Sequence, residues 1–163
     1  EARWLFDLKP SQVEVVIHPQ SIVHSMVRYQ DGAIIAQMGI PDMRIPIAYA
    51  LSFPHRLRIN LRPLELTKNR DLTFLPVERK RYPALHLAYQ ALRSGGTMPA
   101  VLNSANEVAV GAFLNRRIGF RDIHRVIERT MEAHNTTRGR NLQEIIEADR
   151  WARERAERQM TRA

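Results

Sequence analysis

The sequence contains no cysteine, so disulfide bonds, thiolate metal ligands and cysteine nucleophiles are excluded. It also lacks any uninterrupted apolar run near the roughly 18 residues that a membrane-spanning helix needs. The N-terminus shows none of the charged, apolar and small-residue regions of a signal peptide. We therefore expect a cytoplasmic globular protein with no membrane partner, whose 163 residues and 44% apolar content suffice for a core.

Several signatures of catalytic and ligand sites are also missing. Ser21, His24 and Asp42 could form a hydrolase triad, but there is no Gly-x-Ser-x-Gly elbow to support it. The glycine pair within residues 94–97 follows a predicted helix, which favours a helix end over a phosphate-binding loop. His18 and His24 could offer two imidazoles to a metal, yet no acidic residue stands nearby at a supporting spacing. We therefore predict no metal ligands in this chain.

The sequence has little acidic charge relative to its basic charge, with 25 Lys and Arg against 17 Asp and Glu and a net charge of +8. A nucleic-acid partner for the arginine-rich C-terminal third is one hypothesis. In that third, however, arginines alternate with glutamates, a pattern typical of solvated helix faces with mutual ion pairs. We favour the second interpretation and expect no nucleic-acid partner.

The first part of the chain predicts short strands and short helices. Residues 1–9 fit the end of a helix, and the β-branched run 13–17 predicts a strand. The apolar-rich runs 22–30 and 33–38 are joined by Asp-Gly, which predicts an antiparallel hairpin with a type I′ turn. Residues 46–51 predict a short helix with proline in its first turn.

The second part begins with residues 54–81, whose prolines predict an extended linker. From residue 82 onward the apolar period is 3.6, and proline, glycine and capping residues divide this region into four helices. Short connections between four helices predict a small bundle. The fold class is therefore α+β: part of a small mixed or antiparallel sheet with a hairpin, followed by a linker and a four-helix bundle.

Polar residues inside one otherwise apolar helix need partners. Asn103, Asn106 and Glu107 lie in the second predicted helix of the bundle, where unpaired polar groups cost free energy. We expect them to bond across the bundle or to the linker in preference to a catalytic role.

The mixed chemistry of several motifs resembles a known family. These motifs are Ile17-His-Pro-Gln-Ser-Ile-Val-His-Ser-Met-Val-Arg-Tyr29, Asp31-Gly32, Pro41-Asp-Met-Arg44, Leu72-Thr-Phe74, Arg81-Tyr-Pro83, Leu102-Asn103, Ala105-Asn-Glu107, Asp149 and Ala152-Arg153. Together they span nearly the whole chain. They closely resemble the 1-deoxy-D-xylulose 5-phosphate reductoisomerases of the methylerythritol phosphate route to isoprenoids.

The resemblance implies the organisation and the activity of the chain. Residues 1–53 would complete a catalytic domain, 54–81 would be the linker, and 82–163 would be the C-terminal helical domain. The family isomerises a sugar phosphate and reduces the product with NADPH, using Mg or Mn, and it forms homodimers. The chain begins with Glu1 instead of Met, and the family's dinucleotide fingerprint and metal-binding carboxylates are absent. We therefore expect a truncated chain that is inactive alone.

The resemblance carries four site residues to this sequence. His24 matches a histidine implicated in the family's active site, and we expect it to be catalytic. By the same resemblance, Ser21, Pro41 and Met43 are expected to contact the cofactor or the substrate. The side chain of Met43 could pack on a flat ring. The alternative is a non-catalytic interaction or dimerisation module.

Overall fold

The computed structural model describes residues 2–68 and 71–160. These residues belong to two compact units, one comprising Glu1–Glu14 with Glu78–Ala163 and the other Val15–Val77. We call them the bundle unit and the hairpin unit. The α+β class is as predicted, whereas the domain limits drawn from the sequence remain a prediction. In the described part of the chain, no helix has the length and apolar character needed to cross a membrane.

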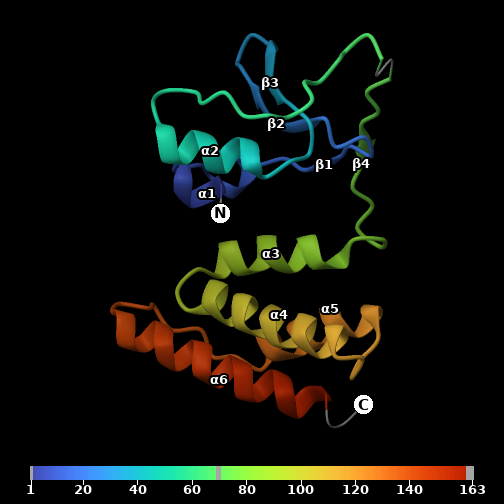
Figure 1. Cartoon of the computed structure of the whole chain (residues 1–163). Helices are drawn as coiled ribbons and strands as arrows, with labels where there is room; N and C mark the ends of the chain where they lie inside the picture. The colour runs from blue at the N-terminus through green and yellow to red at the C-terminus, as the bar shows by residue number, and fades with distance from the viewer. Residues whose placement is uncertain (1, 69–70, 161–163) are drawn as a thin grey trace. The chain divides into compact units, whose positions relative to one another are not determined.

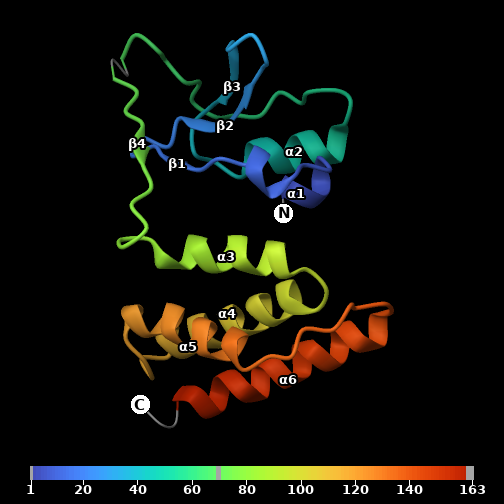
Figure 2. The same cartoon turned by 180° about the vertical axis from the view of Figure 1, so that it is seen from behind.

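The bundle unit contains the four predicted helices. These are α3 (Pro83–Ser94), α4 (Met98–Leu114), α5 (Phe120–Glu132) and α6 (Leu142–Met160). Figures 1 and 2 show α4 between α3 and α6, and α5 packs against both α4 and α6. The four-helix prediction is therefore confirmed.

Small side chains let α4 and α6 approach each other closely. Ala105 and Ala109 on α4, and Ala152 and Ala156 on α6, are fully buried. Larger apolar side chains from α3, α4 and α5 complete the core, among them Leu87, Met98, Val101, Val126, Ile127 and Met131. Alanine also has the highest intrinsic helix propensity, so these positions favour the helix and the packing together.

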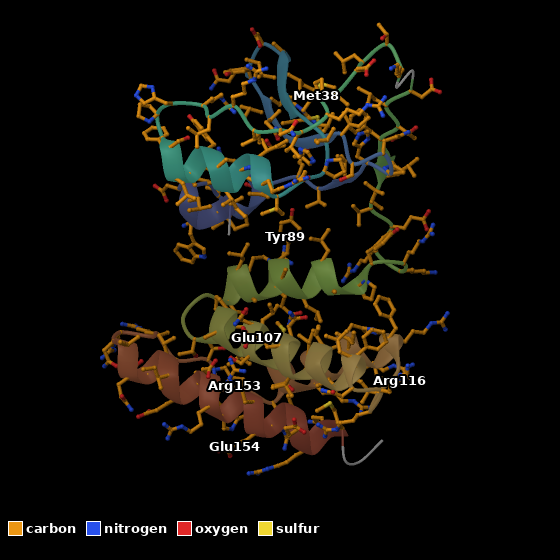
Figure 3. The ribbon with its side chains drawn as sticks, viewed as in Figure 1. Met38, Tyr89, Glu107, Arg116, Arg153 and Glu154 are labelled. Carbon is orange, nitrogen blue, oxygen red and sulfur yellow. The ribbon has the colours of Figure 1, made fainter. Side chains whose placement is uncertain are left out.

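The N-terminal segment belongs to the bundle unit. It forms a short helix, α1 (Ala2–Leu5), and a 3-10 helix, η1 (Pro10–Gln12), which packs against α3. The hydroxyl of Tyr89 on α3 donates a hydrogen bond of 2.6 Å to the carbonyl oxygen of Val13 (Figure 3). The predicted helix end at 1–9 is thus shorter than expected, and residue 1 lies outside the described residues.

The hairpin unit contains two pairs of antiparallel strands and one helix. Strand β1 (Val16–Ile17) pairs with β4 (Leu75–Pro76), and β2 (Val23–Arg28) pairs with β3 (Ile34–Met38). Helix α2 (Arg44–Ser52) follows β3 and is slightly longer than predicted. The predicted strand 13–17 is correct only in its last two residues. Its partner strand lies inside the predicted linker, so that linker contains a short strand.

The hairpin is confirmed, but its predicted turn type is wrong. The N–H of Gly32 donates to the carbonyl of Tyr29 at 3.1 Å, and the N–H of Tyr29 donates to the carbonyl of Ala33 at 2.8 Å. Gly32 has a φ of 89°, while Asp31 is not among the residues with positive φ. A type I′ turn needs positive φ at both central residues, so this is a three-residue loop with glycine in the left-handed position.

Apolar side chains of the hairpin are exposed. Val27 on β2 and Ile35 on β3 are 57% and 62% exposed. Among the described residues of the hairpin unit, Ile22 is the only buried one. A two-stranded hairpin with so little covered apolar surface is at best marginally stable by itself.

Candidate active-site segments

A β-bulge places His24 in strand β2. Val23 lies opposite Met38 and Ser25 opposite Gln37, so two steps along β2 correspond to one step along β3. His24 is therefore the extra residue and lacks a partner on β3. A bulge bends a strand and redirects the side chain of the extra residue, and bulges often occur beside active sites. The His24 side chain is exposed, and its Cε1 atom lies beside Gly39.

A strained turn holds Ser21 just before β2. Its N–H donates to the carbonyl of His18 at 3.0 Å, and its φ is 50°. For a residue with a Cβ atom, the left-handed conformation costs roughly 1 kcal/mol or more in free energy, so surrounding contacts must hold the residue there. Across residues 2–68 and 71–160, no hydrogen bond from the Ser21 hydroxyl or the His24 ring is present, which leaves both side chains able to bind a ligand.

An ion pair fixes the turn that carries Pro41 and Met43. Both carboxylate oxygens of Asp42 accept hydrogen bonds from the Arg44 guanidinium, the shortest at 2.6 Å, and Oδ1 also accepts the Arg44 N–H at 2.9 Å. These hydrogen bonds lower the pKa of Asp42 to about 2. Met43 directly precedes α2 and is 70% exposed. The turn therefore presents a methionine side chain from a fixed backbone.

One backbone hydrogen bond joins the two segments that carry the four predicted site residues. The N–H of Gly39 donates to the carbonyl of Ile22 at 2.9 Å. Ser21 precedes Ile22 and His24 follows two residues later, while Pro41 and Met43 follow Gly39. The structure thus links the two segments through their backbones, and the roles of the four side chains remain a prediction.

The geometry supports neither a metal site at His18 and His24 nor a hydrolase triad that includes Asp42. Nδ1 of His18 lies 2.7 Å from the carbonyl oxygen of Thr73, so that nitrogen already has a partner. Among the described residues, no group of three or more His, Asp and Glu side chains could hold a metal ion. Asp42 bonds to Arg44, so its carboxylate is not available to orient His24 in a hydrolase triad.

A hollow of about 330 Å³ lies next to the same segments. Its wall includes Met38 at the end of β3, Gly39 directly after that strand, and Ile45 and Tyr49 from α2. Met38 is labelled in Figure 3. The guanidinium of Arg56 lies 4.3 Å from the centre of the Tyr49 ring, a cation–π contact that anchors the chain after α2. This hollow is mainly apolar and carries few groups for catalysis.

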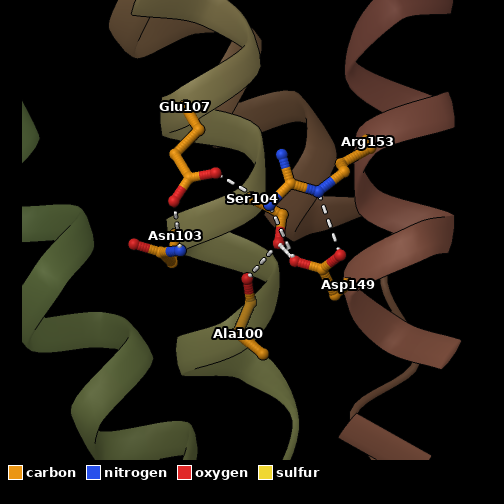
Figure 4. A network of polar contacts seen from close by, with 6 residues as sticks. All are labelled: Ala100, Asn103, Ser104, Glu107, Asp149 and Arg153. Carbon is orange, nitrogen blue, oxygen red and sulfur yellow. Dashed lines mark hydrogen bonds and ion pairs between the residues drawn. The ribbon is translucent and has the colours of Figure 1, made fainter. Parts of the chain in front are cut away.

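The polar residues of α4 form a structural network. Arg153 on α6 donates to Glu107 on α4 at 2.7 Å and to Asp149 at 2.9 Å, and Asn103 donates to Glu107 at 3.0 Å (Figure 4). The Ser104 hydroxyl, which is fully buried, bonds to Asp149. Hydrogen bonds from Arg153 lower the pKa values of Glu107 and Asp149. Of the three residues predicted to bond across the bundle or to the linker, Glu107 bonds across the bundle, whereas Asn103 bonds to Glu107 within α4.

Residues that support the candidate site were not singled out from the sequence. Hydrogen bonds join Gln20 to Thr73, and the ring of Phe74 stacks on that of His18. These contacts lie next to Ser21. The only sequence signal of these residues is membership of the motifs that carry the family resemblance.

Comparison with known proteins settles the family. Residues 38–155 match the model of the DXP reductoisomerase C-terminal domain. The chain belongs to this family. It also aligns over 96% of its length, at 54% identity, with the 1-deoxy-D-xylulose 5-phosphate reductoisomerases of Chlorobium chlorochromatii and Chlorobaculum tepidum. It spans 41% of the length of these two relatives.

Solved reductoisomerase structures have the same fold over this region. The Zymomonas mobilis reductoisomerase in complex with NADPH is 42% identical, with a TM-score of 0.88 over 98% of this chain and 42% of that one. A DOX-P reductoisomerase in complex with NADPH, fosmidomycin and magnesium is 37% identical, also with a TM-score of 0.88. That match covers 98% of this chain and 41% of the other.

Proposed function

We propose that this chain is part of a reductoisomerase that converts 1-deoxy-D-xylulose 5-phosphate to 2-C-methyl-D-erythritol 4-phosphate with NADPH and a divalent metal. The observation that carries the proposal is the 54% identity over 156 residues to curated reductoisomerases. In this proposal residues 1–53 complete the catalytic domain, 54–81 form the linker and 82–163 form the C-terminal domain. The cytoplasmic location and the homodimer expected from the sequence belong to the same proposal.

The exposed side chains of the hairpin unit suit the wall of an active site. The His24 ring can donate or accept a hydrogen bond at a substrate oxygen, and the Ser21 hydroxyl can do the same. Pro41 and the Met43 thioether offer an apolar surface for a flat ring, which fits the nicotinamide of NADPH. NADPH supplies the hydride in such a reaction. We assign the metal to no residue of this chain, and the described residues include no group of three or more potential metal ligands.

Exposed apolar surface on the hairpin agrees with this proposal. Val27, Ile34 and Ile35 are each more than half exposed. The rest of a reductoisomerase would have to cover such a surface, because soluble proteins rarely leave large contiguous apolar patches open to water. We therefore propose that the isolated chain is inactive.

A chimera tests the proposal. The chain would replace the matching segment of the Chlorobaculum tepidum reductoisomerase, and NADPH oxidation would be measured with 1-deoxy-D-xylulose 5-phosphate and Mg or Mn. We expect activity from the chimera, none from the isolated chain, and a large loss of kcat in the His24→Gln chimera. The Thr67→Val chimera, altered at an exposed residue, is the control. A folded chimera with no activity would contradict the proposal.

The second candidate is an interaction or dimerisation module, which the exposed hairpin also favours. It requires the isolated chain to self-associate or bind a partner through residues such as Val27 and Ile35. Sedimentation of the isolated chain, with and without Ile35→Lys, distinguishes the interaction module from the reductoisomerase. An inactive chimera together with a stable dimer that Ile35→Lys disrupts would favour the module.

A further inference from the structure

Two segments far apart in the sequence meet directly before Ser21. Strand β1 pairs with β4, with Ile17 opposite Leu75. The contacts then continue beyond the strands, from His18 and Gln20 to Thr73 and Phe74. The turn that holds Ser21 in the left-handed region therefore begins at a point anchored to residues 73–76.

The ring of His18 is fixed on both sides. Its Nδ1 atom lies 2.7 Å from the carbonyl oxygen of Thr73, and because a carbonyl only accepts, Nδ1 must carry a proton. The ring stacks on Phe74 with centroids 4.7 Å apart and planes 17° apart. Its Nε2 atom is buried, with no hydrogen-bond partner in the described structure. The contacts hold one tautomer and one orientation of a residue three positions before Ser21.

Gln20 and Thr73 form a closed pair of hydrogen bonds. The amide Nε2 of Gln20 donates to the Thr73 hydroxyl at 2.9 Å, and the Thr73 N–H donates to Oε1 of Gln20 at 3.2 Å. Both residues are exposed, so the pair adds little to the stability of the fold. Its geometry, in contrast, fixes the orientation of the residue that immediately precedes Ser21.

We propose that Gln20, Thr73 and the His18–Phe74 stack form a positioning clamp for the Ser21 turn and, through it, for His24 on the bulge. None of the clamp residues needs to touch the substrate. The clamp holds Ser21, three residues before His24, at its φ of 50° and sets where β2 begins. This inference rests on the proposed function, because it assigns the clamp to the same site.

The test uses the full-length chimera with Gln20→Ala, Thr73→Val, Thr73→Ser and the double variant Gln20→Ala/Thr73→Val. Thr73→Val removes the hydroxyl that accepts from Gln20, whereas Thr73→Ser keeps it. Thr67→Val is the matched control, because Thr67 is an exposed threonine of the same linker outside the clamp. The readouts are kcat, KM and the urea midpoint of unfolding.

Loss of the clamp should lower kcat, with KM and the unfolding midpoint near those of the parent chimera. We expect a roughly tenfold fall in kcat for Gln20→Ala and for Thr73→Val, because small misplacements of reacting groups slow catalysis strongly. The double variant should be no slower than either single variant, and Thr73→Ser should stay within about twofold of the parent. Equal losses in Thr73→Val and Thr73→Ser, or additive losses in the double variant, would overturn the clamp.

A second measurement separates failure of the clamp from failure of the proposed function. In the 163-residue chain itself, nitrogen NMR of His18 should show the tautomer protonated at Nδ1. Thr73→Val should shift the amide signals of Ser21 and His24, and Thr67→Val should not. Unchanged signals in Thr73→Val would overturn the clamp even with an active chimera. Shifted signals with an inactive chimera would support the clamp and contradict only the reductoisomerase assignment.

Discussion

The hydroxyl oxygen of Thr97 lies 2.8 Å from Nε2 of His134 and also accepts the N–H of Thr137 at 3.1 Å. Thr97 is fully buried at the start of α4, and its own N–H donates to the carbonyl of Thr137 at 3.0 Å. One threonine therefore joins the α3–α4 turn to the loop between α5 and α6.

Replacement of Thr97 should destabilise the bundle unit. Thr97→Val keeps the approximate shape of the side chain. It removes the hydroxyl that accepts the hydrogen bond of the Thr137 N–H and that bonds to Nε2 of His134. We expect a loss of about 1–3 kcal/mol in the free energy of unfolding, measured by urea titration. Thr136→Val, at an exposed neighbour, is the control and should change it by less than about 0.5 kcal/mol. Equal effects of the two substitutions would contradict the role of Thr97.

His134 should make the stability depend on pH on the acid side of neutrality. Burial lowers the pKa of His134 below the ordinary histidine value of 6.5, so the folded state takes up a proton there less readily than the unfolded state. The resulting stability is complete above pH 6.5 and is lost progressively as the pH falls below it. His134→Gln should remove this dependence of the urea midpoint on pH. A slope that persists in His134→Gln would assign it to other groups.

Two glycines of the bundle unit should respond to alanine in opposite directions. Gly96 has a φ of 52°, and an added Cβ would lie 1.9 Å from the carbonyl oxygen of Thr137. Gly96→Ala should therefore destabilise the chain by more than about 2 kcal/mol. Gly111 lies in α4 with nothing within 4 Å of an added Cβ, so Gly111→Ala should raise stability by up to about 1 kcal/mol. Thermal unfolding of both variants provides the comparison, and a tolerated Gly96→Ala would count against the close approach to Thr137.

The network around Arg153 should contribute stability that is lost in acid. Its side chain and that of Asp149 are 41% and 37% exposed, so screening by solvent limits the effect of Arg153→Met to about 1 kcal/mol. The hydrogen bonds from Arg153 and Ser104 lower the pKa of Asp149 below the ordinary aspartate value of 3.8. The stabilisation is therefore present above pH 3.8 and disappears as the pH falls through the folded pKa.

Urea unfolding of the wild-type and Arg153→Met chains, near neutral pH and in acid, checks this effect. The difference between them should shrink below pH 3.8. Arg158→Met is the control, because within residues 2–68 and 71–160 Arg158 pairs with the exposed Glu154 one turn earlier on α6. A difference that stays constant with pH would show that Arg153 acts through packing and not through its ion pairs.

Local signals in the sequence predicted the bundle and the hairpin well. Proline at the start and glycine at the end bounded α3, and the 3.6-residue period located the other helices. The Asp31-Gly32 pair located the hairpin but not its loop type, because only Gly32 takes a positive φ. A dipeptide signals a turn, whereas strand register decides which turn forms.

Non-local contacts could not be predicted in the same way. Leu75 pairs with Ile17 although the residues around it show no strand period, and Thr73 meets Gln20 from within a predicted linker. The bulge at His24 was also invisible, because the extra residue becomes apparent only when β2 is aligned with β3. The candidate site residues themselves came from the family resemblance, and the clamp next to them required the structure.

The bundle unit consists of two separate stretches of the sequence, which suggests that the chain can be cut between them without loss of that unit. Val13 bonds to Tyr89 although 76 residues separate them, and η1 packs against α3. Residues 56–65 form neither helix nor strand, so a protease could cut there. The fragment that begins with residues 1–14 would remain attached to the helices through these contacts. Two separately produced pieces should then reassemble by fragment complementation.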